Sequence, residues 1–156
     1  MKKVLLAAAA IAAAALIRNS FAGTTMQNVS VSATVAAVCS FTNAGSGIKI
    51  GVINPLGNAT TINATMTTQP LFWCTKGFNY SITDDNGQHE LGATYRLKGP
   101  GADDYIPYTL TYTKTGRGAG RSESLNPAIF ASVKASDFRD AEAGDYSDTV
   151  TLTINY

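Results

Sequence analysis

The feature that most constrains the fold is the stretch from Gly23 to Cys39, in which apolar and polar residues alternate over an unusual length. Counting back in twos from Cys39 gives Ala37, Val35, Ala33, Val31 and Val29, and the positions between include Thr34, Ser32, Ser30 and Asn28. This pattern predicts extended chain with one apolar face. A strand usually has about 5 to 6 residues, and this stretch is more than twice as long without a turn signal.

The N-terminal part of this stretch therefore has to extend beyond the domain that follows it. A strand with an apolar face and unpaired backbone groups is a liability for a lone soluble protein, so we expect it to complete the sheet of another molecule. The alternative is an ordinary edge strand of its own domain. Its length and the lack of a turn argue against that alternative.

The beginning of the chain has the pattern of a secretory signal. Lys2 and Lys3 precede an apolar run from Val4 to Ile17, which is shorter than the roughly 20 residues of a membrane-spanning helix but suits a signal peptide. Ser20 and Ala22 supply small residues before a cleavage site, so we expect cleavage after Ala22. An uncleaved membrane anchor is the alternative.

Removal of residues 1–22 leaves 134 of the 156 residues, enough for one domain with a hydrophobic core. Three of the 12 basic residues would leave with the signal, so nine basic and 11 acidic residues would remain, a net charge of −2. The chain therefore lacks the basic surface that typifies nucleic-acid-binding proteins.

Both cysteines, Cys39 and Cys74, lie after the signal. In an exported protein such a pair is most simply explained by one disulfide bond. His89 is the only histidine, and two thiols at this separation do not resemble a zinc site. We expect no metal and no cofactor.

Beyond Cys39, short apolar stretches are separated by turn residues, which is typical of an all-β protein. The candidate strands cover residues 48–53, 70–74, 78–83, 91–97, 106–113, 128–134 and 149–156, and a Thr-rich run over residues 60–68 leads to the second of them. Tight turns or loops are expected at residues 84–87, 100–104 and 116–120, and an acidic connection at residues 137–145. Such a strand count at this spacing predicts a sandwich or barrel.

The last candidate strand stops at the end of the chain. No later segment is therefore expected to pair with the strand edge that stays open beside it. The sandwich therefore lacks one strand, and the N-terminal segment is one strand in excess. The N-terminal segment of a second copy of the chain could supply the strand that the sandwich lacks.

The chain combines the alternating segment that runs into the first cysteine, a second cysteine after Phe72-Trp73, the strand Tyr105–Tyr108 and the ending Ala143–Tyr156. Together these features resemble the spore coat protein U domain family, over essentially the whole chain after the signal. The Gly-Asp-Tyr-Ser-Asp-Thr-Val motif of the ending is fairly specific to it. The best understood members are subunits of archaic chaperone-usher pili.

This resemblance implies an incomplete immunoglobulin-like β-sandwich that lacks its final strand, with an N-terminal donor-strand extension over residues 23–34 and the domain itself over residues 35–156. It also implies that a periplasmic chaperone lends the missing strand until, at an outer-membrane usher, another subunit's N-terminal strand replaces it. Transferred to this sequence, the resemblance gives donor residues Val29, Val31 and Ala33, a disulfide between Cys39 and Cys74, and an acceptor groove lined by Val150, Leu152, Ile154 and Tyr156. The Gly- and Arg-rich loop Lys114–Ser124 departs from the family pattern, which leaves its role open.

We therefore expect a structural pilus subunit that is secreted through the periplasm to the cell surface, with no catalytic residues and no small-molecule substrate. Its partners would be the chaperone, the usher and other copies of itself or related subunits. The alternatives are a secreted coat protein that uses the same strand exchange, a self-contained carbohydrate-binding adhesin and a small secreted hydrolase. An adhesive tip subunit usually needs a separate receptor-binding domain, for which 134 residues leave no room.

Other patterns have simpler explanations than a site. Gly116–Arg121 could suggest a phosphate-binding loop, but no helix follows it. Asp84–Gly87 lacks the spaced carboxylates of a calcium loop, and no nucleophile motif lies near His89. The tyrosines at strand spacing are expected in the core or on a sheet surface rather than in a sugar-binding platform.

Overall fold

The computed structural model describes residues 22–156, so the signal expected over residues 1–22 lies outside the described part except for Ala22. Residues Val35–Tyr156 form one compact unit, called the domain below. Its elements are β1 (Cys39–Asn43), β2 (Thr61–Thr65), β3 (Leu71–Cys74), β4 (Asn79–Asp84), β5 (Tyr95–Lys98), β6 (Tyr105–Thr111), β7 (Thr115–Arg117), β8 (Phe130–Lys134), α1 (Ala135–Phe138) and β9 (Leu152–Asn155). The expected all-β class is confirmed.

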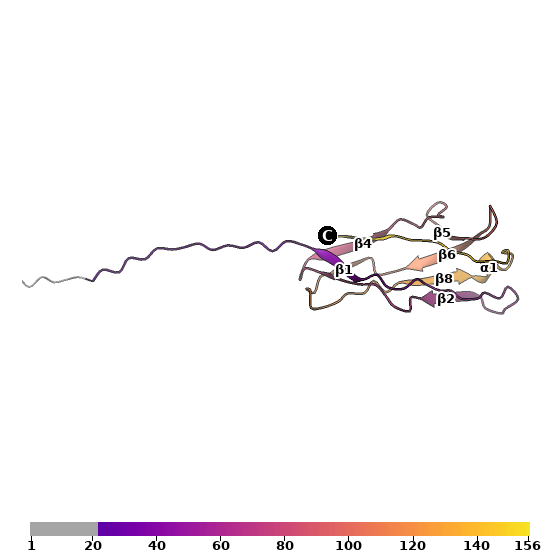
Figure 1. The fold of residues 1–156 in the computed structure, drawn as a ribbon, viewed down its shortest axis with the longest axis horizontal. Coiled ribbons are helices and arrows are strands. Elements are labelled where there is room, and N and C mark those ends of the chain that lie inside the picture. The colour runs from indigo at the N-terminus through magenta and orange to yellow at the C-terminus, as the bar shows by residue number, and fades with distance from the viewer. Residues whose placement is uncertain (1–21) are drawn as a thin grey trace, which may run out of the picture. The chain divides into compact units, whose positions relative to one another are not determined.

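All strand pairs are antiparallel and form three sheets. The sheet orders are β1-β3, β2-β8-β6-β5 and β7-β4-β9, and Figure 1 shows their arrangement. β9, the last strand, pairs with β4 alone in the described part of the chain. Among residues 22–156, no helix is long and apolar enough to cross a bilayer.

The alternating sequence pattern explains which side chains are buried. In β4 the side chains of Tyr80 and Ile82 face the core, and they join Phe72 and Cys74 of β3 in one cluster. The rings of Phe72 and Tyr80 meet edge to face at 5.1 Å. A second cluster contains Ile106 of β6, Val133 of β8, and Ala135 and Phe138 of α1.

Several segments differ from the sequence-based expectation. β1 begins at Cys39, where the expected strand ended, and β2 forms from residues 61–65, which were not a candidate strand. Residues 48–53 form no strand, and only Ile48 makes a bridge, to Met66. The helix α1 begins two residues before the expected acidic connection and includes its first two residues. It is a single turn, which is too short for a helical period to be visible in the sequence. The Gly-rich loop begins with the short strand β7, which pairs with β4.

β7 is a strand because its glycine fits against a buried tyrosine. Gly116 lies opposite Tyr80 in the register of β4 and β7. A Cβ atom at Gly116 would overlap the phenol group of Tyr80. The sequence therefore contains a glycine here because of close approach between strands, and this glycine was mistaken for a loop signal.

Candidate functional site

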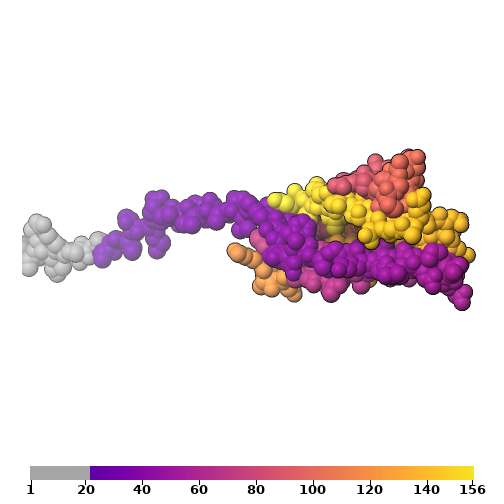
Figure 2. All heavy atoms as spheres, turned by 45° about the vertical axis from the view of Figure 1, so that its right-hand side comes forward, coloured from indigo at the N-terminus to yellow at the C-terminus, as the bar shows by residue number. Residues whose placement is uncertain are grey.

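The domain has a groove of about 800 Å³ between two segments that are far apart in the sequence. One wall is residues 48–53 with Pro55, and the other is residues 141–148. Leu97, Ile106 and Phe138 line the groove between these walls. Figure 2 shows the hollow between the purple and the orange-to-yellow parts of the surface.

The two walls are not hydrogen-bonded to each other. The backbone N–H and C=O groups of Ser147 bond to Lys98 of β5, at 3.0 and 2.8 Å. In the other wall, Ile48 pairs outward with Met66. No backbone hydrogen bond in the described part of the chain joins residues 48–55 to residues 141–148. The groove is therefore open between its two walls.

The wall of residues 48–53 carries apolar side chains that the domain covers incompletely. Ile50 and Ile53 are half-buried and pack against the cluster of Ile106, Val133 and Phe138. Val52 is 102% exposed, and Leu56, just beyond this wall, is 93% exposed. Apolar side chains are therefore open to solvent beside the groove.

Of the four residues expected to line an acceptor groove, Leu152 and Ile154 lie on β9, and Val150 and Tyr156 lie just outside its two ends. Leu152 and Ile154 are half-buried and pack against the cluster of Phe72, Tyr80 and Ile82. Val150 is half-buried and Tyr156 is 57% exposed. None of the four lines the 800 Å³ groove itself. The second edge of β9 has no partner strand in residues 22–156. Contact of these four residues with an inserted strand stays a prediction.

The groove residues that the sequence did not identify are those of residues 48–53 and 141–148. The alternation in residues 150–156 indicated the strand but not the wall that precedes it. The sequence shows apolar residues at 48, 50, 52 and 53. It does not show that these residues lack a partner strand in the domain.

The N-terminal segment, residues 22–34, is described here by itself. No strand is assigned in it, and Figure 1 draws it as an extended trace without a turn. Val29 is 80% exposed, Val31 is 90% exposed, and Ala33 is also exposed. Its role as a donor strand stays a prediction.

The start of the domain is fastened to β3. Cys39 of β1 and Cys74 of β3 lie opposite each other and are joined by a disulfide, with a Cα–Cα distance of 4.1 Å. Just before β1, the backbone N–H of Val38 donates to Thr75 Oγ1 at 3.0 Å. The backbone N–H of Thr75 donates to the C=O of Val38 at 2.9 Å. The disulfide and these hydrogen bonds hold the chain where it enters the domain.

A set of tyrosine–aspartate hydrogen bonds holds the segment that leads into β9. Tyr108 of β6 donates to Asp148 Oδ2 at 2.8 Å, and the backbone N–H of Gln88 donates to Asp148 Oδ1 at 3.0 Å. Burial, followed by the hydrogen bond to Asp148, raises the pKa of Tyr108. Tyr146 donates to Asp104 and to the C=O of Glu142. Two residues of the Gly-Asp-Tyr-Ser-Asp-Thr-Val motif thus position the second wall of the groove.

A related contact connects β6 to the end of β4. Tyr112 donates a hydrogen bond to Asp84. Burial of Asp84 raises its pKa, but hydrogen bonds from Tyr112, Tyr95 and the backbone of Asn86 outweigh burial, so the net pKa is lowered. Burial and Asp84 together raise the pKa of Tyr112 to about 12. Tyr112 and Tyr95 therefore act as hydrogen-bond donors to the end of β4.

The remaining candidate sites have structural roles. The Asp84–Gly87 turn is closed by its own carboxylates, since Asp84 accepts from the backbone N–H of Asn86 at 2.8 Å and Asp85 from that of Gly87 at 3.0 Å. Arg117 in the Gly-rich loop donates to the C=O of Gly77 at 2.8 Å. Within residues 22–156 no group of three or more His, Cys, Asp or Glu side chains is arranged to hold a metal ion.

Comparison with known proteins gives a family and several solved structures. One of these structures is the complex of a chaperone with a tip adhesion subunit, CsuC–CsuE, from archaic chaperone-usher Csu pili of Acinetobacter baumannii. It has 16% sequence identity and a TM-score of 0.43, and the match covers 79% of this chain and 41% of that chain. No curated protein matches the sequence. The model of the Spore Coat Protein U domain matches residues 25–153, which confirms the resemblance seen in the sequence, and the chain therefore belongs to the Spore Coat Protein U domain family.

Proposed function

We propose that this chain is a structural subunit of a surface pilus that polymerises by donor-strand exchange. One observation carries the proposal: the same chain has a groove with two walls that are not bonded to each other and an N-terminal segment with exposed, alternating apolar residues. A strand from a second copy would supply a row of main-chain hydrogen bonds along the groove and alternate side chains within it.

In this proposal residues 1–22 are the export signal, residues 23–34 the donor strand and residues 35–156 the acceptor domain. Val29, Val31 and Ala33 would face into the groove of the next copy. Fully burying one valine side chain is worth roughly 1.5–3 kcal/mol, so Val29 and Val31, the smaller Ala33 and the backbone hydrogen bonds would together make a joint that opens slowly.

The proposed partners follow from the exposed groove. Before a second copy arrives, Val52 and Leu56 are open to solvent, and an apolar surface of this kind favours aggregation. A periplasmic chaperone would lend a strand during export, and an outer-membrane usher would exchange it for the donor strand of another copy. The subunit would reach the cell surface in the fibre and would perform no catalysis. A coat of the spore coat U type would assemble by the same exchange.

Val31→Asp tests the proposal, with Ser32→Asp as the matched control. The two variants add the same charge to the same segment, but at neighbouring positions that face opposite sides of a strand. Val31→Asp would place a carboxylate in an apolar groove, which costs several kcal/mol. It should block polymerisation and leave the chaperone-bound subunit soluble, whereas Ser32→Asp should polymerise.

The measurement is fibre yield from cells that also produce the chaperone and usher, compared with the yield of soluble chaperone complex. Normal polymerisation of Val31→Asp would show that residues 23–34 are not the donor strand. An equal loss of fibre yield in both variants would show that insertion does not distinguish the two faces of the N-terminal strand. That result would also contradict the proposal.

A further inference from the structure

Charged residues gather at the two ends of the domain. The first group, called the basic end, is Lys76, Arg117 and Arg121, all exposed. The loops that carry them are joined, because the backbone N–H of Gly120 donates to the C=O of Cys74 at 3.1 Å. The Arg121 guanidinium lies 5.8 Å from the centre of the Trp73 ring.

The second group, called the acidic end, comes from α1 and two loops. It contains Asp103, Asp104, Asp137, Asp140, Glu142 and Asp145, each exposed or half-exposed. The loops meet through Tyr146, which donates to Asp104 and to the C=O of Glu142. Four cations lie near these carboxylates. Arg139 follows α1 and Lys134 precedes it, Lys49 lines the same groove as Glu142, and the Nζ of Lys98 donates to the backbone C=O groups of Gly101 and Ala102. Carboxylates therefore outnumber cations at this end.

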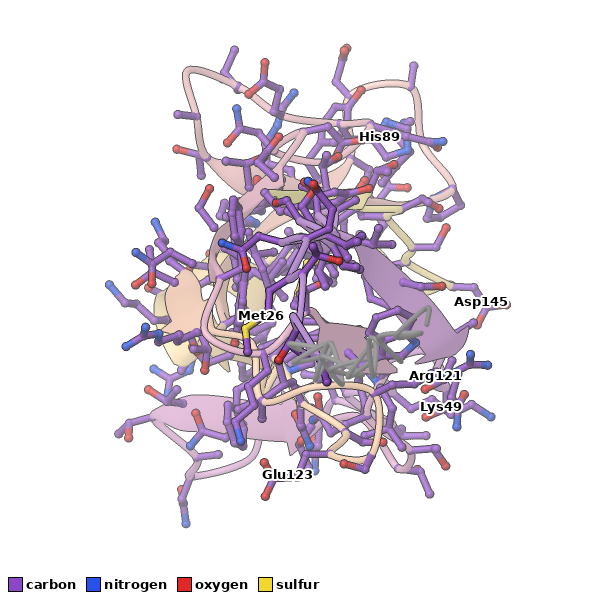
Figure 3. The ribbon with its side chains drawn as sticks, turned by 90° about the vertical axis from the view of Figure 1, so that its left-hand side faces the viewer. Met26, Lys49, His89, Arg121, Glu123 and Asp145 are labelled. Atoms are coloured by element: carbon purple, nitrogen blue, oxygen red, sulfur yellow. A yellow bond between two sulfur atoms is a disulfide. The ribbon has the colours of Figure 1, made fainter. Side chains whose placement is uncertain are left out.

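The two groups lie at opposite ends of the same domain. β8 runs into α1, and β6 is antiparallel to β8, so the loop before β6 lies at the α1 end and the loop after it at the other. In Figure 1, α1 is at the right and the start of β1 is at the left. Figure 3 looks from the left-hand side of Figure 1 and labels Arg121 of the basic end and Asp145 of the acidic end. Glu123 is the acidic residue nearest in sequence to Arg121.

We propose that, at each joint between copies, the basic end of one copy docks against the acidic end of the next. This inference rests on the proposed strand exchange. The chain enters the domain at the basic end, where Val38 is hydrogen-bonded to Thr75, the neighbour of Lys76. A copy that inserts its N-terminal segment into a groove must therefore bring its basic end to the acceptor. Glu142 and Asp145 lie in a wall of that groove.

The charges also select the direction of the inserted segment. β9 runs toward the basic end, because Leu152 lies opposite Asp84 and Asn155 opposite Ser81, while Arg117 lies opposite Asn79. A segment antiparallel to β9 leaves the groove at the acidic end, where the basic end of its own domain would follow. A parallel segment would leave at the basic end and bring like charges together. Opposite charges across an interface guide encounter and fix register more than they add affinity.

Chemical cross-linking tests the arrangement without changing the sequence. Fibres assembled from equal amounts of ¹⁵N-labelled and unlabelled subunits would be treated with a carbodiimide, which joins a lysine amine directly to a carboxylate, and mapped by mass spectrometry. Mixed-label cross-links should join Lys76 to Asp140, Glu142 or Asp145. Mixed-label cross-links from Lys76 to Glu123 instead would place two basic ends together and overturn the proposal.

Charge reversal tests the energetic role. Arg117→Glu combined with Arg121→Glu should slow assembly from the chaperone complex by about tenfold at low salt, since steering by complementary charge changes association rates by about 10- to 1,000-fold. Adding Asp140→Lys and Asp145→Lys in the same chain should restore the rate to within about twofold. Because exposed charges are screened beyond about 10 Å at 0.1 M salt, the difference should shrink as salt is raised.

Glu123→Lys is the control, because it adds positive charge at the basic end and should not slow assembly. An unchanged rate for the doubly reversed basic end, or no recovery in the four-residue variant, would refute the charge-matched joint. Val31→Asp separates this result from the proposed function. If Val31→Asp blocks assembly while the reversed variants assemble as wild type, strand exchange stands and the joint is wrong; if Val31→Asp assembles normally, strand exchange itself is wrong.

Discussion

The disulfide between Cys39 and Cys74 should contribute nearly 4 kcal/mol to the stability of the domain. It closes a loop with a sequence separation of 35 residues. In the chain-entropy relation, a loop of this length corresponds to about 3.8 kcal/mol at 25 °C. Reduction keeps both side chains in place, and Cys74 is 1% exposed in the core cluster of Phe72 and Tyr80. The comparison of oxidised with reduced protein therefore isolates the loop closure from packing.

Urea unfolding followed by Trp73 fluorescence measures this contribution. Trp73 is the only tryptophan and is adjacent to Cys74, so its emission reports the region that the disulfide joins. Both forms would be measured with a saturating synthetic peptide of residues 23–38, which fills the groove equally in each. With a denaturant slope of about 1–3 kcal/mol per M, reduction should lower the urea midpoint by about 2 M.

The double variant Cys39→Ala, Cys74→Ala is the control, since reductant should leave its midpoint unchanged. A shift of less than about 0.5 M on reduction of the wild type would refute the reasoning. It would mean that the reduced, unfolded chain is already restricted, so that the bond removes little additional freedom.

Three further predictions concern the contact of Tyr108 with Asp148 and that of Gly116 with Tyr80. Tyr108→Phe removes the hydroxyl that donates to Asp148 at 2.8 Å and should cost about 1–2 kcal/mol in urea unfolding; no loss would show that Asp148 does not depend on this donor. Burial, then Asp148, raises the pKa of Tyr108, so its stabilisation is present below about pH 10 and is lost as the pH rises through the higher folded-state pKa. The urea midpoint should therefore fall more steeply above pH 10 in wild type than in Tyr108→Phe, and parallel curves would contradict this assignment. Gly116→Ala should destabilise by about 1–3 kcal/mol because its Cβ would overlap the Tyr80 phenol, and Gly116→Ala combined with Tyr80→Phe should lose less than the two changes summed; simple additivity in unfolding experiments would count against the clash.

Much of the strand content could be predicted from alternation alone. The segments that became β3, β4, β6, β8 and β9 each have apolar residues at every second position or a short apolar run, and each buries those residues. The family assignment also came from the sequence, because its motifs are local. These features depend on neighbours one or two residues apart, which a single sequence records directly.

The parts that were missed depend on residues distant in the sequence. Gly116 was interpreted as a loop residue because the tyrosine that it accommodates, Tyr80, is on another strand. The hydrogen bonds of Tyr108 to Asp148 and of Tyr146 to Asp104 span 40 and 42 residues. Residues 48–53 have a strand-like sequence but pair with no strand of the domain, apart from the single bridge of Ile48 to Met66. No local pattern reports which pairs meet.

The position of the disulfide has a mechanical consequence for a chain that is pulled by its N-terminus. Tension on the segment before Cys39 passes through a covalent bond to Cys74, next to the buried core at Phe72. The five residues of β1 therefore lie behind a clamp and are not peeled from β3 one hydrogen bond at a time. In a fibre bent or stretched at the cell surface, load would enter each subunit through this bond and reach its interior before it could unravel its first strand.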